Sequence, residues 1–226
     1  MSFAIPDEYL VEHYPSPEER AADRWVHIVA ICGAVIATLT LIVVAIAGKR
    51  PGLAIALALY GAALTAMLGL SALYNLSHIS PARPFLRRLD EAGIFLMIAG
   101  SYTPFTTQIL KGGWSIGMTG LVWTMACLGI AGKLVLPRLS ERIWTGVYVV
   151  FGWTAVLALQ PLSQSLPLTA MVLLVAGGLV YTGGCWIFLN QRLPFRRAVW
   201  HGFICAGAAL HFGAVIFGVV LVPTRV

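Results

Sequence analysis

Four polar residues lie at the ends of long apolar segments, where polar side chains are rare unless they serve a function. Ser71 and Asn75 close one segment, and their four-residue spacing puts both on one face of a helix. Asp90 opens the next segment, and His201 lies about one turn into the last segment. A serine, a carboxylate and an imidazole at one depth could hold a metal ion and activate a water molecule.

Each of these residues also has a structural interpretation. Asp90 could cap a helix, because it directly precedes an apolar run. Ser71 could bond to a carbonyl one turn earlier, and His201 could lie at the membrane interface beside Trp200. His27, which follows Trp25, fits an interfacial residue better than a metal ligand.

The remaining polar candidates add little to a metal site. His211 lies about 15 Å deeper than His201, where an imidazole usually bonds a neighbouring helix or lines a cavity. His78 follows a predicted helix end and is expected in solvent. With one convincing imidazole, one carboxylate and a poor ligand in Asn75, the count of good zinc ligands is too small for a site.

The composition is that of an integral membrane protein. Of the 226 residues, 59% are hydrophobic and 11% are charged, whereas soluble domains carry about 25% charge. The net charge of +6 is spread over short loops, so nucleic-acid binding is not expected and membrane lipids are the expected partners. The four cysteines lie within apolar runs and are expected to be small core residues rather than disulfides.

Hydropathy predicts an all-α polytopic fold with seven transmembrane helices. A tail over residues 1–24 precedes a membrane domain over residues 25–222, and each apolar segment is long enough to cross a bilayer, which takes about 20 residues. The predicted spans are 25–47, 53–76, 90–109, 114–136, 143–160, 166–189 and 198–221. No repeat of 20–50 residues is evident, and the chain shows no separate soluble domain.

The basic residues predict the orientation of the chain. Eleven of the 15 lie in the N-terminal segment and alternate loops, and four lie on the opposite side. The eleven are Arg20, Arg24, Arg83, Arg87, Arg88, Lys133, Arg138, Arg142, Arg192, Arg196 and Arg197. The positive-inside rule therefore predicts a cytoplasmic N-terminus and an external C-terminus, and it brings Ser71, Asn75, Asp90 and His201 to the cytoplasmic leaflet.

The run LRRLDEAGIFLMIAGSYTPF, residues 86–105, resembles the third-helix signature of the hemolysin III proteins. These are bacterial members of the progestin and adipoQ receptor family. DRWVHI, SALYNLSH and AVWHGFICAGAALHFGAV are similar to the family's first-, second- and last-helix segments, so the resemblance covers the chain from about residue 20. It implies a seven-helix, multi-pass protein of the bacterial inner membrane with a cytoplasmic N-terminus.

The resemblance also implies a zinc site near the cytoplasmic face. Its serine corresponds to Ser71, its aspartate to Asp90 and one of its histidines to His201. Its other two histidines fall on Asn75 and Arg197, and a guanidinium binds no metal. We therefore expect zinc to be absent or weakly bound.

Three alternatives follow for this altered site. Arg197 could pair with Asp90 in place of the metal, which is the interpretation we favour. His78 or His27 could be recruited as a ligand. The site could also bind an anionic lipid headgroup through Arg197 and the loop arginines.

The sequence leaves the activity open among three functions. The first is a role in membrane homeostasis or lipid sensing. The second is a metal-dependent lipid-amide hydrolase, with Ser71 as oxyanion donor and Asp90 orienting the water. The third is a channel or pore-forming cytolysin, although the segments between residues 114 and 189 have few polar residues to line a pore.

Overall fold

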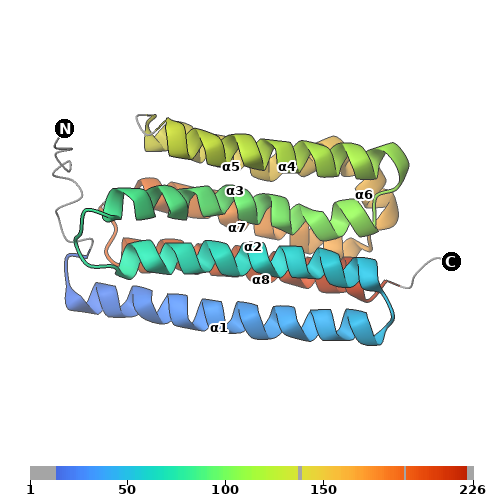
Figure 1. Ribbon diagram of the computed structural model, residues 1–226, viewed down its shortest axis with the longest axis horizontal. Helices are drawn as coiled ribbons and strands as arrows, with labels where there is room; N and C mark the ends of the chain where they lie inside the picture. The colour runs from blue at the N-terminus through green and yellow to red at the C-terminus, as the bar shows by residue number, and fades with distance from the viewer. Residues whose placement is uncertain (1–13, 137–138, 191, 223–226) are drawn as a thin grey trace.

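The computed structural model describes residues 14–136, 139–190 and 192–222. Every regular element among these residues is helical, and the helices run side by side along the length of the molecule (Figure 1). The elements are α1 (Pro17–Ala47), α2 (Pro51–Leu76), α3 (Arg83–Gln108), α4 (Gly112–Val135), α5 (Glu141–Gly152), η2 (Trp153–Ala158), α6 (Leu159–Ser165), α7 (Leu168–Leu189), α8 (Arg196–Val215) and η3 (Ile216–Val220). The all-α prediction is confirmed.

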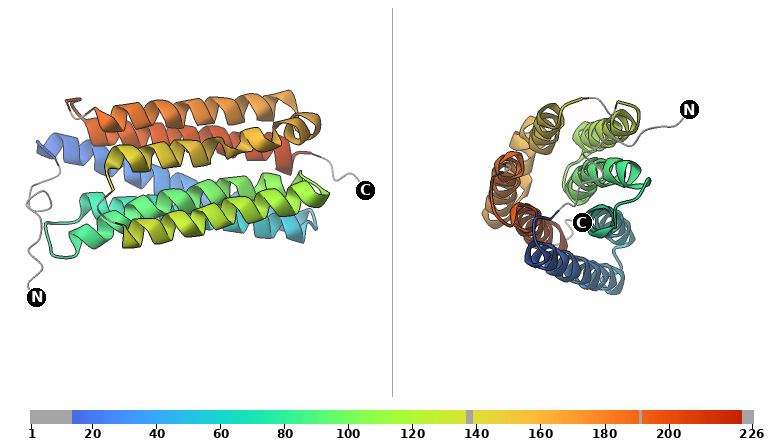
Figure 2. Two further views of the ribbon diagram at one scale, coloured as in Figure 1. Left: turned by 90° about the horizontal axis from the view of Figure 1, so that it is seen from above. Right: turned by 90° about the vertical axis from the view of Figure 1, so that its left-hand side faces the viewer.

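The helices form a bundle of seven membrane-crossing units. Six of the described units are long and apolar enough to span a bilayer, with α5, η2 and α6 together forming one and α8 with η3 another. The seventh, α3, is as long but less apolar, and it packs between α2 and α4. Seen end-on, the helices follow one another around a ring that closes where α8 contacts α1 (Figure 2). The predicted seven-helix fold is confirmed.

The first helix begins well before residue 25, where the first span was predicted. Ser16 caps it by accepting a hydrogen bond from the amide of Glu19 at 3.3 Å, and Pro17 occupies the first turn. Both are typical signals of a helix start. The extra turns carry Asp23 into α1, whereas the sequence had placed this residue in the N-terminal tail.

The fifth predicted span is not one continuous α-helix. A 3-10 segment, η2, separates α5 from α6. The Tyr102 hydroxyl bridges the break, because it donates to the carbonyl of Gly152 at 2.7 Å and accepts from the amide of Ala155 at 2.7 Å. Backbone groups freed inside a membrane need such partners.

Tyr102→Phe is expected to destabilise this break by about 1–3 kcal/mol, because one backbone donor and one acceptor lose their partner. Hydrogen exchange should show faster exchange of the Ala155 amide. Tyr181→Phe is the matched control, because the buried Tyr181 hydroxyl has no hydrogen-bond partner among the described residues. Equal exchange at Ala155 in the two variants would contradict the bridging role of Tyr102.

Candidate functional site

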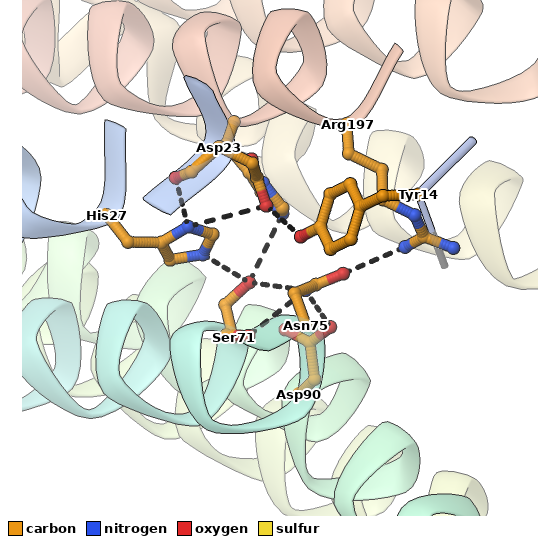
Figure 3. A network of polar contacts seen from close by, with 8 residues as sticks. Tyr14, Asp23, His27, Ser71, Asn75, Asp90 and Arg197 are labelled. Atoms are coloured by element: carbon orange, nitrogen blue, oxygen red, sulfur yellow. Dashed lines mark hydrogen bonds and ion pairs between the residues drawn. The ribbon is translucent and has the colours of Figure 1, made fainter. Parts of the chain in front are cut away.

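A cluster of polar side chains lies inside the end of the bundle where α1 begins (Figure 3). Four helices contribute to it, and Tyr14, which precedes α1, also takes part. Its members are Tyr14, Asp23, His27, Ser71, Asn75, Asp90, Arg197 and His201. The structure thus brings together all five residues singled out from the sequence, and it adds Tyr14, Asp23 and His27.

Asp23 is fully buried and binds partners from two directions. Its Oδ1 atom accepts a hydrogen bond from Nδ1 of His201 at 2.6 Å. Its Oδ2 atom accepts a hydrogen bond from the Tyr14 hydroxyl. Burial, followed by the charge of Asp23, raises the pKa of Tyr14 far above its usual range, so this hydroxyl keeps its proton and remains a donor.

His27 lies one turn beyond Asp23 and is 2% exposed. Its Nδ1 atom donates to the backbone carbonyl of Asp23 at 2.9 Å, and its ring meets that of His201 with the centroids 4.4 Å apart. The interfacial placement expected for His27 is therefore wrong. The residue faces the interior because it shares with Asp23, four residues earlier, the face of α1 that is buried in the bundle.

Ser71 lies between the two imidazoles. Its Oγ atom is 3.4 Å from Nε2 of His27 and 3.3 Å from Nε2 of His201. Oγ also accepts a hydrogen bond from Nδ2 of Asn75 at 3.3 Å. This hydroxyl therefore joins α1, α2 and α8 at one point.

Asn75 connects the two charged residues of the cluster. Its Oδ1 atom accepts from a guanidinium nitrogen of Arg197 at 2.8 Å, and its Nδ2 atom lies 3.5 Å from Oδ2 of Asp90. The ion pairs among the described residues do not include Arg197 with Asp90. The favoured interpretation of a direct pair is therefore wrong, because the amide stands between the two charges.

The other histidines of the described chain play different parts. Nε2 of His211 lies 3.2 Å from the carbonyl of Leu174, and its ring packs against Tyr181, as expected for a deep imidazole. His78 is exposed. His13 lies outside the described residues.

A second set of charged residues lies at the same end of the bundle. Glu91 pairs with Arg87 at 2.8 Å and with Lys133, and Arg87 also pairs with Glu141. The Lys133 ammonium lies 4.5 Å from the centre of the Trp144 ring. These contacts connect α3, α4 and α5. The two imidazoles of the cluster lie on α1 and α8 instead.

A cavity of about 330 Å³ extends from the polar cluster into the bundle. This volume falls within the range of small-molecule sites, about 300–1,000 Å³. Its polar end is lined by cluster residues, and its apolar part is lined by Met67, Leu68, Ile94, Met97, Ile98 and Ile204. Tyr102, Trp153 and His211 also line it, so the cavity reaches the level of the break in the fifth unit.

The fold and the site define a class: a multi-pass α-helical membrane protein with a buried histidine–carboxylate cluster at one end of an internal cavity. The chain belongs to the haemolysin-III-related family, because residues 18–212 match the sequence model of that family. It is therefore a multi-pass bacterial membrane protein.

Several relatives agree with this assignment. Hemolysin-3 of Bacillus cereus is 34% identical over 190 residues, which cover 82% of this chain and 86% of the relative. The Hemolysin-3 homolog of Bacillus subtilis is 34% identical over 151 residues, with 67% and 70% covered. The human monocyte to macrophage differentiation factor is 24% identical over 163 residues, with 70% and 67% covered.

The residues present do not fit the zinc ligand set that the resemblance implies. Two of its three histidine positions hold Asn75 and Arg197, which are hydrogen-bonded to each other. A divalent ion placed there would be repelled by the guanidinium charge, at about 1–4 kcal/mol per unit charge at 4 Å. A different set, Asp23, His27 and His201, offers three ligand atoms within 4.8 Å of one another and could bind a metal ion.

Sequence reasoning missed Asp23, although two signals pointed to it. Ser16 and Glu19 have the spacing of a capping box, which marks a helix start. In a helix starting there, Asp23 and His27 are four residues apart and share a face.

Proposed function

We propose that this protein binds an acyl-chain lipid in its internal cavity and serves in lipid sensing or membrane homeostasis. The observation that carries the proposal is the continuity of the cavity, which begins at a charged cluster and continues along apolar side chains. An amphiphile has the same division between a polar headgroup and an apolar chain. The cavity therefore matches the chemistry of a single-chain lipid.

Two guanidinium groups at the polar end are suited to binding an anionic headgroup, beside the carboxylates that line the same end. Arg196 and Arg197 are adjacent on the first turn of α8, and both line the cavity. Arg196 donates to the carbonyl of Phe188 at 2.7 Å, and Arg197 donates to Asn75. Guanidinium groups bind carboxylate and phosphate oxygens through paired hydrogen bonds.

The apolar part of the cavity argues against the channel alternative. An ion-conducting path requires polar groups along its length, whereas Met67, Leu68, Met97 and Ile98 surround the region beyond the cluster. A cavity lined largely by apolar side chains agrees better with lipid binding.

A second candidate function is hydrolysis of a lipid amide, in which water adds across the amide bond and releases an amine and a carboxylate. It is favoured by one observation: His27, His201 and Ser71 meet at the end of the cavity where a headgroup would lie. Release of free fatty acid from a labelled lipid amide, abolished by Ser71→Ala, would support it. No release by the wild-type protein would exclude that substrate class.

Filling the cavity should displace the lipid. Ala30 lines the cavity, so Ala30→Trp would place an indole inside it. Native mass spectrometry of the detergent-purified protein should show at least a tenfold lower fraction of lipid-bound protein in this variant. Val29→Trp is the matched control, because Val29 is 68% exposed on the outer face of the same helix.

Removing the guanidinium tests the headgroup separately. Arg197→Ala should lower the bound fraction of anionic lipids more than that of neutral lipids, because only the former lose a charge-assisted hydrogen bond. Arg192→Ala, in the exposed loop before α8, is the control. Equal lipid retention in the Ala30→Trp and Val29→Trp proteins would overturn the proposal.

A further inference from the structure

The cavity has a second group of polar side chains deep inside the bundle, well away from the charged cluster. His211 lies ten residues beyond His201 on α8, which corresponds to about 15 Å along a helix. Ser101 lies eleven residues beyond Asp90 on α3, and α3 and α8 begin at the same end of the bundle, so Ser101 reaches a similar depth. Both His211 and Ser101 line the cavity.

The contacts of His211 leave one of its ring nitrogens without a proton and without a partner. Nε2 lies 3.2 Å from the carbonyl of Leu174, which is an acceptor only, so Nε2 carries the ring proton. In the neutral ring, Nδ1 then carries a lone pair, and none of the described residues donates to it.

The orientation of the His211 ring is fixed by its neighbour α7. A Cβ atom at Gly177 would lie 2.3 Å from Cδ2 and 2.6 Å from Nε2 of His211, so this edge of the ring faces the α7 backbone. Tyr181 packs edge-on against the same ring, with the centroids 5.3 Å apart. Nδ1 lies on the edge that points away from α7, and this edge is available to a ligand in the cavity.

The neighbouring donors in the deep part of the cavity are already used. The hydroxyls of Ser101, Tyr102 and Thr182 donate to backbone carbonyls at 2.7–2.8 Å. The indole of Trp153 donates to the Thr182 hydroxyl at 3.1 Å. The Tyr181 hydroxyl has no partner among the described residues, but it is buried away from the cavity surface. Apart from two thiols, which are weak donors, this part of the lining offers acceptors, namely His211 Nδ1 and the lone pairs of Ser101 Oγ.

We propose that the deep part of the cavity is a second subsite, which binds a hydroxyl group on the acyl chain of the ligand. The ligand hydroxyl would donate its proton to Nδ1 of His211, and Ser101 Oγ offers a further acceptor at a similar depth. About 12 carbon atoms of an extended chain span the distance of about 15 Å from the cluster. The inference rests on the proposed lipid binding, and it specifies the ligand class as single-chain lipids with a hydroxyl in the middle of the chain.

The sign of the selectivity distinguishes this subsite from a purely apolar cavity. Moving a hydroxyl from water into apolar surroundings costs free energy unless it finds a hydrogen-bond partner. A mid-chain hydroxyl would therefore weaken binding to an apolar cavity, whereas here it would meet an unpaired ring nitrogen and strengthen binding. A ketone at the same carbon has no proton to donate, so it should be rejected.

The test compares four chains of equal length on the full-length protein in detergent, by competition in native mass spectrometry. 12-Hydroxyoctadecanoate should bind about three- to tenfold more tightly than octadecanoate. 12-Oxooctadecanoate should bind more weakly than octadecanoate, because its oxygen would face a lone pair. 6-Hydroxyoctadecanoate should also bind more weakly, because its hydroxyl would lie among apolar side chains such as Met97 and Ile204.

Two variants assign the preference to His211. His211→Phe keeps an aromatic ring but removes both nitrogens, so 12-hydroxyoctadecanoate should lose its advantage over octadecanoate. His211→Gln keeps a donor for Leu174 and an acceptor oxygen, and it should retain at least a twofold preference. His78→Phe, at an exposed histidine, is the control and should leave the preference unchanged.

The wild-type protein alone can refute the inference, even if His211→Phe fails to fold. Binding of octadecanoate with no advantage for 12-hydroxyoctadecanoate would overturn the second subsite and leave the proposed lipid binding intact. Binding of neither chain would overturn both. A preference that persists in folded His211→Phe protein would overturn the role of His211.

Discussion

Asp23→Ala is expected to lower the free energy of unfolding by about 3 kcal/mol. The change removes both acceptors of a fully buried carboxylate, so the Tyr14 hydroxyl and Nδ1 of His201 lose their partners at once. It also separates the segment before α1 from α8, which Asp23 joins. Unfolding of the purified protein in a denaturing detergent, followed by circular dichroism, measures the loss.

Asp23→Asn is the matched control for that experiment. The amide keeps an acceptor oxygen for His201 and nearly the same volume, so the loss should be less than half of that in Asp23→Ala. Tyr14→Phe removes the other partner and should lower stability by about 1 kcal/mol. Equal free energies of unfolding for Asp23→Ala and Asp23→Asn would show that the hydrogen bonds of Asp23 do not stabilise the protein.

Gly100→Ala is expected to lower the free energy of unfolding by about 1–3 kcal/mol, a large effect for a single methyl group. A Cβ atom at position 100 would lie 2.4 Å from Cβ of Ala63, where α3 crosses α2. Ala63 has no side-chain torsion through which it could move away, so the two helix backbones must separate. Small residues at such crossings allow close packing of membrane helices.

Gly69→Ala provides the control on α2, since a Cβ atom there would meet nothing within 4 Å. Alanine favours a helix over glycine by about 0.5–1 kcal/mol, so this variant should be as stable as the wild type or more stable. The same detergent unfolding assay compares the two variants. Destabilisation of both to the same extent would show that the α2–α3 contact is not the cause.

The sequence predicted most of the helices well because hydropathy identifies segments that can cross a bilayer, although α3 is less apolar than the other six units. It also anticipated that Ser71, Asn75, Asp90 and His201 would meet, because alternating spans return to the same side of the membrane. The starts of the helices were less predictable. α1 gains its first turns from the Ser16 cap rather than from apolar residues, so a hydropathy criterion omits the turn that carries Asp23.

The sequence pattern does not predict which side chains on different helices contact one another. Opposite charges favoured a pair between Arg197 and Asp90, but the helices place Asn75 between them. The break between α5 and α6 depends on Tyr102 from another helix, so the residues of the broken segment do not reveal it. In both cases the outcome is set by distances between side chains that are far apart in the chain.

Asn75 gives the junction between Arg197 and Asp90 a property that an imidazole would lack. An amide offers a donor and an acceptor that do not depend on protonation, whereas a histidine changes its charge between about pH 5 and pH 8. The link from α8 through α2 to α3 therefore keeps its hydrogen-bonding pattern when the surrounding solution becomes acidic. Asn75 therefore connects Arg197 and Asp90 in a way that does not depend on pH. A histidine at this position would have made the connection depend on pH.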